Sequence, residues 1–182
     1  DAALVNNTIG EVVHISAVSD THLNAMDMDP SYGNKKNSLI EKADFILSLF
    51  EQLVGSGNLS PKEKSILDRC TSQVYEPYIR GGYNPDETPT LKDLYALLLQ
   101  QPEEEAHGLA LSAEFFITGS LNTFAHKTNV NTSARVICYD IRELGEQLMP
   151  IGMLVTLDAI YNRVIRNWKH GKTTWIFCDE FY

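Results

Sequence analysis

Three short runs of β-favouring residues alternate with long stretches of helical periodicity, and this alternation constrains the fold more than any other feature. The runs are residues 11–16 (EVVHIS), 135–140 (RVICYD) and 173–178 (TTWIFC). Each combines β-branched, aromatic and aliphatic side chains, which is typical of strands. A helical pattern over 148–168 separates the last two runs, and a strand, helix and strand of this length favour a parallel pair with a right-handed crossover. We therefore predict an α/β fold with a short parallel sheet.

Four segments with helical spacing of apolar residues lie between the first two predicted strands. They begin near Ser38, Ser60, Thr90 and Pro102. Ser60 and Glu63 have the spacing of a capping box, in which each side chain accepts a hydrogen bond from the other residue's backbone N–H. Consecutive amphipathic helices predict an all-helical bundle inserted into the α/β part. We expect the helical insertion to span residues 35–119 and the α/β core to comprise residues 1–34 and 120–182.

The composition argues against several classes of protein. The 24 acidic and 15 basic residues give a formal charge of −9, so direct nucleic-acid binding by this chain is not expected. No stretch reaches the roughly 18 uninterrupted apolar residues of a membrane-spanning helix, and we expect a soluble chain. The three cysteines include no C-x-x-C pair, which indicates neither a disulfide framework nor a zinc site and favours a reducing cytoplasm.

Two acids, Asp179 and Glu180, follow the apolar run over 173–178. Ligands of open α/β sheets bind in the crevice beyond the carboxyl ends of the strands, so acids in this position can act on a bound substrate. In P-loop NTPases the Walker B carboxylates lie there. The plain alternative is that both are solvated acids in the turn after a strand. Because Tyr182 ends the sequence just behind a run that we expect to be buried, we interpret the chain as an internal fragment.

A series of motifs in a fixed order accompanies this acidic pair. In sequence order they are GSLNTFAHKTNV from Gly119, RVICYDI, Leu144-Gly145, IGMLV from Ile151, and WIFCDE. In this order the motifs resemble the conjugative-transfer and type IV secretion ATPases, the VirB-type members of the HerA–FtsK superfamily of P-loop NTPases. The resemblance covers nearly the whole chain and implies a partial RecA-like core that ends at Walker B.

The resemblance also implies roles for residues, cofactors and partners. Asp179 would hold Mg²⁺ through water and Glu180 would be the catalytic base. The full-length parent would use ATP and Mg²⁺, whereas none is expected on the fragment, which has no G-x-x-x-x-G-K-[ST] loop. The parent would be a cytoplasmic protein peripheral to the inner face of the cell membrane. It would form a hexamer and contact type IV secretion channel proteins and a coupling ATPase.

Two other functions remain open on the sequence alone. The helical region could be a non-catalytic interaction module of a secretion or conjugation complex, with the strands as scaffold. A metal-dependent hydrolase could use Asp179, Glu180, Asp140 and a histidine. Within the Gly119–Asn129 motif, His126 could approach the nucleotide crevice or serve loop packing. Asp140 could lie near the site or bond to its own loop.

Overall fold

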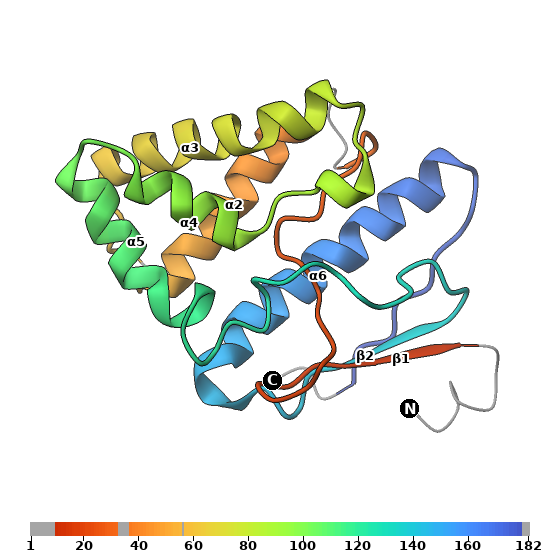
Figure 1. Ribbon diagram of the computed structural model, residues 1–182. Helices are drawn as coiled ribbons and strands as arrows, with labels where there is room; N and C mark the ends of the chain where they lie inside the picture. The colour runs from red at the N-terminus through yellow and green to blue at the C-terminus, as the bar shows by residue number, and fades with distance from the viewer. Residues whose placement is uncertain (1–9, 33–36, 56, 180–182) are drawn as a thin grey trace.

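A mixed α/β architecture with many helices is seen in the computed structural model, which describes residues 10–32, 37–55 and 57–179. The helical bundle lies at one end of the molecule, the strands lie at the other, and the last helix runs between them (Figure 1). The fold class predicted from the sequence is therefore confirmed. The elements are β1 (Glu11–His14), α2 (Ser38–Val54), α3 (Pro61–Arg80), the short 3₁₀ helix η1 (Pro85–Glu87), α4 (Leu91–Leu99), α5 (Glu104–Ile117), β2 (Ile137–Asp140) and α6 (Gly145–Lys169).

The helices of the bundle begin where local capping chemistry places them. The carboxylate of Glu63 accepts from the backbone N–H of Ser60 at 2.7 Å, and Ser60 Oγ accepts from the N–H of Glu63 at 3.3 Å, which confirms the predicted capping box. Thr90 and Asp93 form a second such box at α4. These bonds satisfy backbone N–H groups that the first helical turn leaves without partners. The starts of α3 and α4 could therefore be predicted from the sequence.

The two strands pair in parallel, with Glu11 opposite Ile137 and His14 opposite Asp140. The connection between them contains α2, α3, α4 and α5. Because parallel strands run in the same direction, His14 and Asp140 end at the same edge of the sheet. This edge is where a ligand of an α/β protein is expected to bind.

The third strand, predicted over residues 173–178, is not formed. Residues 172–178 have no regular secondary structure, and Trp175 and Phe177 are 80% and 90% exposed. A strand needs a neighbour whose backbone satisfies its N–H and C=O groups, and β propensity cannot replace that neighbour. The segment pairs with neither β1 nor β2, although it runs back from the end of α6 toward the sheet (Figure 1). The expected burial of this run and its crossover unit with β2 were therefore wrong for this structure.

A buried ion pair joins the bundle to α6. The side chain of Lys42 on α2 is fully buried, and its Nζ lies 3.1 Å from Oδ2 of Asp158 on α6. The Tyr32 hydroxyl donates to Oδ1 of Asp158 at 2.5 Å, and Lys42 Nζ lies 4.8 Å from the centre of the Tyr32 ring. Burial lowers the pKa of Lys42, while Asp158 opposes this shift. Removal of either side chain would leave the other as a buried charge without a counter-charge.

Helix α6 is, among the described residues, the one helix long and apolar enough to cross a membrane by length and composition alone. Its charged side chains bind other parts of the protein. Arg163 donates to the backbone carbonyls of Thr132 and Ala134, and Arg166 pairs with Asp29. Such contacts are also made by long helices that pack inside folded proteins.

Candidate functional site at the carboxyl edge of the sheet

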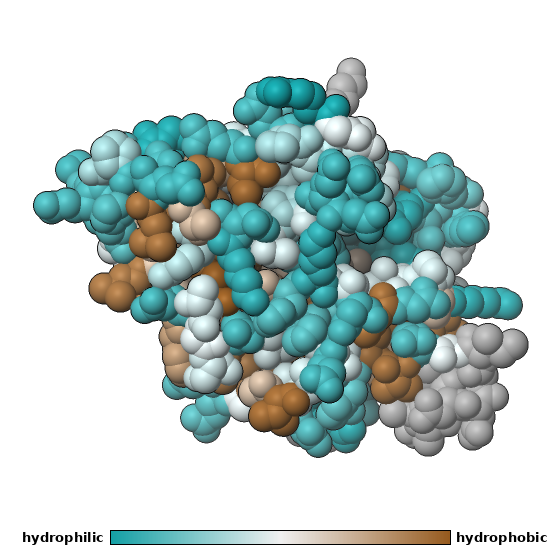
Figure 2. Space-filling model, viewed as in Figure 1, coloured by the Kyte–Doolittle hydropathy of each residue, from teal (hydrophilic) through white to brown (hydrophobic). Residues whose placement is uncertain are grey.

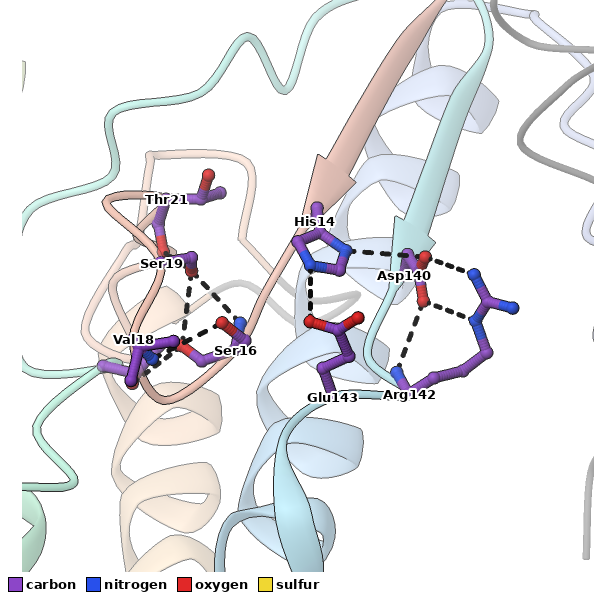
Figure 3. A network of polar contacts seen from close by, with 9 residues as sticks. His14, Ser16, Val18, Ser19, Thr21, Asp140, Arg142 and Glu143 are labelled. Atoms are coloured by element: carbon purple, nitrogen blue, oxygen red, sulfur yellow. Dashed lines mark hydrogen bonds and ion pairs between the residues drawn. The ribbon is translucent and has the colours of Figure 1, made fainter.

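A polar network lies where the two strands end (Figure 3). Nδ1 of His14, the last residue of β1, lies 3.5 Å from Oδ2 of Asp140, the last residue of β2. Nε2 of the same ring lies 3.1 Å from Oε2 of Glu143. The imidazole is thus held between two carboxylates, one from the neighbouring strand and one from the loop that leads into α6.

Asp140 is held by the residue two positions further along the chain. The guanidinium of Arg142 donates to both carboxylate oxygens, from Nε at 2.9 Å and from Nη2 at 2.7 Å. These hydrogen bonds, opposed by partial burial, lower the pKa of Asp140 well below its usual range. Asp140 therefore stays ionised at neutral pH and bonds to its own loop. Whether it also approaches a ligand stays a prediction.

The Gly119–Asn129 motif reaches the same edge through contacts with the loop after β1. The hydroxyl of Thr123 donates to the backbone carbonyl of Ser16 at 3.3 Å, two residues beyond β1. The backbone N–H of Ala25 donates to the carbonyl of Phe124 at 3.2 Å. The motif therefore helps to shape the loop that borders the sheet edge.

Close packing of α6 depends on a glycine of the predicted motif series. A Cβ atom on Gly152 would lie 2.1 Å from Cδ1 of Leu144 and 3.3 Å from Cζ of Phe124. A larger residue would force the Leu144 side chain to move and would press on Phe124 of the Gly119–Asn129 motif. The glycine of the IGMLV motif thus has a packing reason in this structure.

His126 lies in a cluster with residues that are distant in sequence. Its ring stacks on that of His22, and Nζ of Lys92 lies 3.4 Å from its Nε2. Nε2 also lies 3.2 Å from Oδ1 of Asn122, so the neutral tautomer with a proton on Nε2 satisfies this contact. Burial lowers the pKa of His126, and the charge of Lys92 and the ring of His22 lower it further.

We expect the chain to lose stability as the pH falls below 6.5 because of His126. Its pKa in the folded chain is lower than the unfolded value. The stabilisation by neutral His126 is therefore fully present above the pKa of the unfolded chain. It is lost as the pH falls through the pKa of the folded chain. His126→Gln should flatten this dependence, measured as the free energy of unfolding in urea at a series of pH values.

The control for this experiment is His107→Gln, on α5, whose ring contacts the backbone carbonyl of Gln101. The slope of stability against pH should change more in His126→Gln than in this control. Asp27 has a pKa raised by burial and acts in the opposite sense, but it is present in all three proteins and cancels in the comparison. Equal slopes for the wild type and His126→Gln would contradict the expectation.

The predicted catalytic acids are only partly described. Asp179 is exposed, lies in a bend after the irregular segment, and bonds to no other described residue. Glu180 lies outside the described residues. Their roles as magnesium-associated acid and catalytic base stay predictions. Across residues 10–32, 37–55 and 57–179, no group of three or more histidine, cysteine or acidic side chains is arranged to hold a metal ion, so the metal-dependent hydrolase gains no support there.

Sequence reasoning assigned no role to several residues that the fold brings together. His14 lies inside the predicted first strand, and only the observed end of strand pairing places it at the sheet edge. Arg142 and Glu143 follow the second strand directly, which is a usable signal for residues near such an edge. No sequence signal linked His22 to His126, because their proximity depends on how two irregular segments pack.

Comparison with known proteins shows a likeness in fold. No protein-family model matches this sequence, and no curated protein matches it. The solved structure of VirB4 of Thermoanaerobacter pseudethanolicus matches with a TM-score of 0.73 over 91% of this chain, at 16% sequence identity. The match covers 66% of that structure's own chain. The chain described here therefore has the fold of a part of VirB4.

Proposed function

We propose that this chain is part of an ATPase that energises conjugative DNA transfer or type IV secretion. The observation that carries the proposal is the fold shared with VirB4 over 91% of the chain. The ordered motifs from Gly119 to Glu180 resemble VirB-type ATPases independently of that fold. Because the motifs and the fold are separate observations, their agreement supports the assignment more than either does alone.

The proposed chemistry depends on the two acids behind the run over 173–178. Asp179 would hold the water shell of Mg²⁺ at the phosphates of ATP, and Glu180 would orient and deprotonate the attacking water. Two observations favour this arrangement. The chain returns from α6 toward the sheet (Figure 1), and the run is apolar but exposed, as a strand without its neighbour would be.

The phosphate-binding loop would come from sequence outside this chain, since no G-x-x-x-x-G-K-[ST] occurs here. That loop supplies most of the grip on the phosphates, through backbone N–H groups and its lysine. At the catalytic site, ATP and Mg²⁺ would therefore bind the full-length parent and not the isolated fragment. We propose a hexameric parent at the cytoplasmic face of the membrane, in contact with secretion channel proteins and a coupling ATPase.

Removal of metal tests this function directly. In the longer protein that contains this chain, ATP hydrolysis should require Mg²⁺, stop when EDTA is added in excess, and return when Mg²⁺ is restored. The isolated chain should show no hydrolysis under the same conditions. Hydrolysis that persists in EDTA, or a longer protein that never hydrolyses ATP, would count against the proposal.

One observation favours the non-catalytic alternative, an interaction module built on the helices. Leu111 and Phe115 lie one turn apart on α5 and are 70% and 48% exposed. In Figure 2 hydrophobic side chains are exposed at the bundle end of the molecule, and others are exposed near the strands. A longer protein without ATPase activity that still binds a secretion component through Leu111 and Phe115 would favour this alternative.

A further inference from the structure

A cluster of two histidines and a lysine includes none of the residues that end the two strands. The rings of His22 and His126 are stacked, with their centres 4.4 Å apart and their planes 20° apart. Nζ of Lys92, in the first turn of α4, lies 3.5 Å from Nδ1 and 3.4 Å from Nε2 of His126. Three separate segments of the chain thus bring potential positive charges to one place.

None of the described carboxylates balances this charge. The chain carries more acids than bases, yet no ion pair between described residues includes Lys92, His22 or His126. Asp93, the sequence neighbour of Lys92, accepts instead from the backbone N–H and the hydroxyl of Thr90, at 2.7 Å and 2.8 Å. Lys92 is therefore a positive charge with no carboxylate partner among the described residues, beside two imidazoles that can take up protons.

The two loops that carry the histidines are fastened to each other. The backbone N–H of His22 donates to Oδ1 of Asn129 at 2.8 Å, and the N–H of Asn129 donates back to the carbonyl of His22 at 3.2 Å. The N–H of Asn24 donates to the hydroxyl of Thr128 at 2.8 Å. Long irregular loops inside a compact fold are commonly functional. These bonds hold the rings in position before any ligand arrives.

The ammonium of Lys92 has only weak partners in this arrangement. Distances of 3.4 Å and 3.5 Å to ring nitrogens are long for hydrogen bonds. The repulsion between Lys92 and a protonated His126 also contributes to the lowered pKa of that histidine. An anion that contacts the edge of this cluster would accept from Lys92 and would favour protonation of the imidazoles, which become donors.

We propose that Lys92, His22 and His126 form a binding site for a phosphate-class oxyanion, either inorganic phosphate or the phosphate of a nucleotide. Lys92 supplies a charge-assisted hydrogen bond, and the two imidazoles take up proton charge as the anion binds. The proposal does not rest on ATP hydrolysis, because all three residues belong to this chain and binding can be measured without turnover.

The test is a titration of the 182-residue chain with inorganic phosphate and, separately, with ADP, followed by NMR of the histidine Cε1–H signals. Ionic strength is held at about 0.15 M with chloride, so that general screening stays constant. We expect saturable shifts of the His22 and His126 signals in the millimolar range, with those of His107 and His170 unchanged. Tighter binding of ADP than of phosphate would identify a nucleotide phosphate as the anion, and equal binding would identify simple phosphate.

Two substitutions separate a specific site from general charge. Lys92→Gln should weaken phosphate binding at least about tenfold, the effect of losing one charge-assisted hydrogen bond. Lys62→Gln, which removes an exposed lysine paired with Glu105 on α5, should leave binding unchanged. If Lys92→Gln does not fold, His22→Gln is the second variant, with the same expected loss. Absence of a saturable shift in the wild type, or equal binding by the wild type and the folded variant, would overturn the proposal.

Discussion

Replacing Asp158 by alanine is expected to destabilise the chain by about 3–5 kcal/mol, because the fully buried Lys42 would lose its counter-charge. The hydroxyl of Tyr32 would lose its acceptor in the same step. The measurement is the free energy of unfolding from urea denaturation. The fold explains the size of the effect, since the pair joins α2 of the bundle to α6.

Two further variants show whether the charge is the cause. Lys42→Met combined with Asp158→Asn removes both charges and keeps an oxygen acceptor for Tyr32. This double variant should be clearly more stable than Asp158→Ala alone. The exposed acid Asp44, also on α2, provides the control, and Asp44→Ala should change stability by less than about 0.5 kcal/mol. A loss below about 1 kcal/mol for Asp158→Ala would show that Lys42 does not depend on this partner.

Replacing Glu180 by glutamine in the proposed full-length ATPase is expected to lower the rate of ATP hydrolysis by about 10²–10⁴-fold, the usual contribution of a general base. Glutamine keeps the size and hydrogen-bonding capacity of the side chain but cannot take a proton. Binding of Mg²⁺ and ATP should therefore persist. The measurement is steady-state hydrolysis, together with nucleotide binding by fluorescence.

A matched substitution elsewhere separates catalysis from a change in surface charge. Glu104→Gln removes an exposed acid at the start of α5 and should leave turnover unchanged. Turnover at the wild-type rate in Glu180→Gln would remove Glu180 from the proposed role. Loss of nucleotide binding in that variant would assign Glu180 to binding in place of proton transfer.

The helices could be predicted because their signals are local. The capping box of Ser60 and Glu63, the glycines after Val54 and Arg80, and the spacing of apolar residues all lie within a few residues of the helix that they define. Helix α3 follows Ser60, where the capping box predicts its start, and ends at Arg80, directly before Gly81. Local chemistry thus determines these helix boundaries, which is why the sequence predicts where they lie in the structure.

The strands were harder to predict because pairing is not local. The runs over 11–16 and 135–140 form shorter strands that pair with each other. The run over 173–178 pairs with neither strand and is irregular. All three runs have similar propensity, so composition could not distinguish them. What distinguishes them is whether a neighbouring strand is available.

The residues of the site likewise divide into those that a local pattern predicts and those that distant contacts bring together. Asp140 was expected at the end of a strand and lies there, because a strand and its last residue can be predicted together. The contact of His14 with Glu143 and the stack of His22 on His126 join residues more than 100 positions apart. Such contacts depend on loop packing, which no local pattern encodes.

The most direct test of the proposed function is a crystal structure of the longer protein with Mg²⁺ and a non-hydrolysable ATP analogue. Residues 173–178 should then form a buried strand, parallel to β1 and β2. Asp179 should lie at the same edge as His14 and Asp140, with its carboxylate at the water shell of the metal. A helix in this segment, an exposed coil, or a strand paired only antiparallel at the periphery would contradict the assignment of Asp179 and Glu180 to ATP hydrolysis.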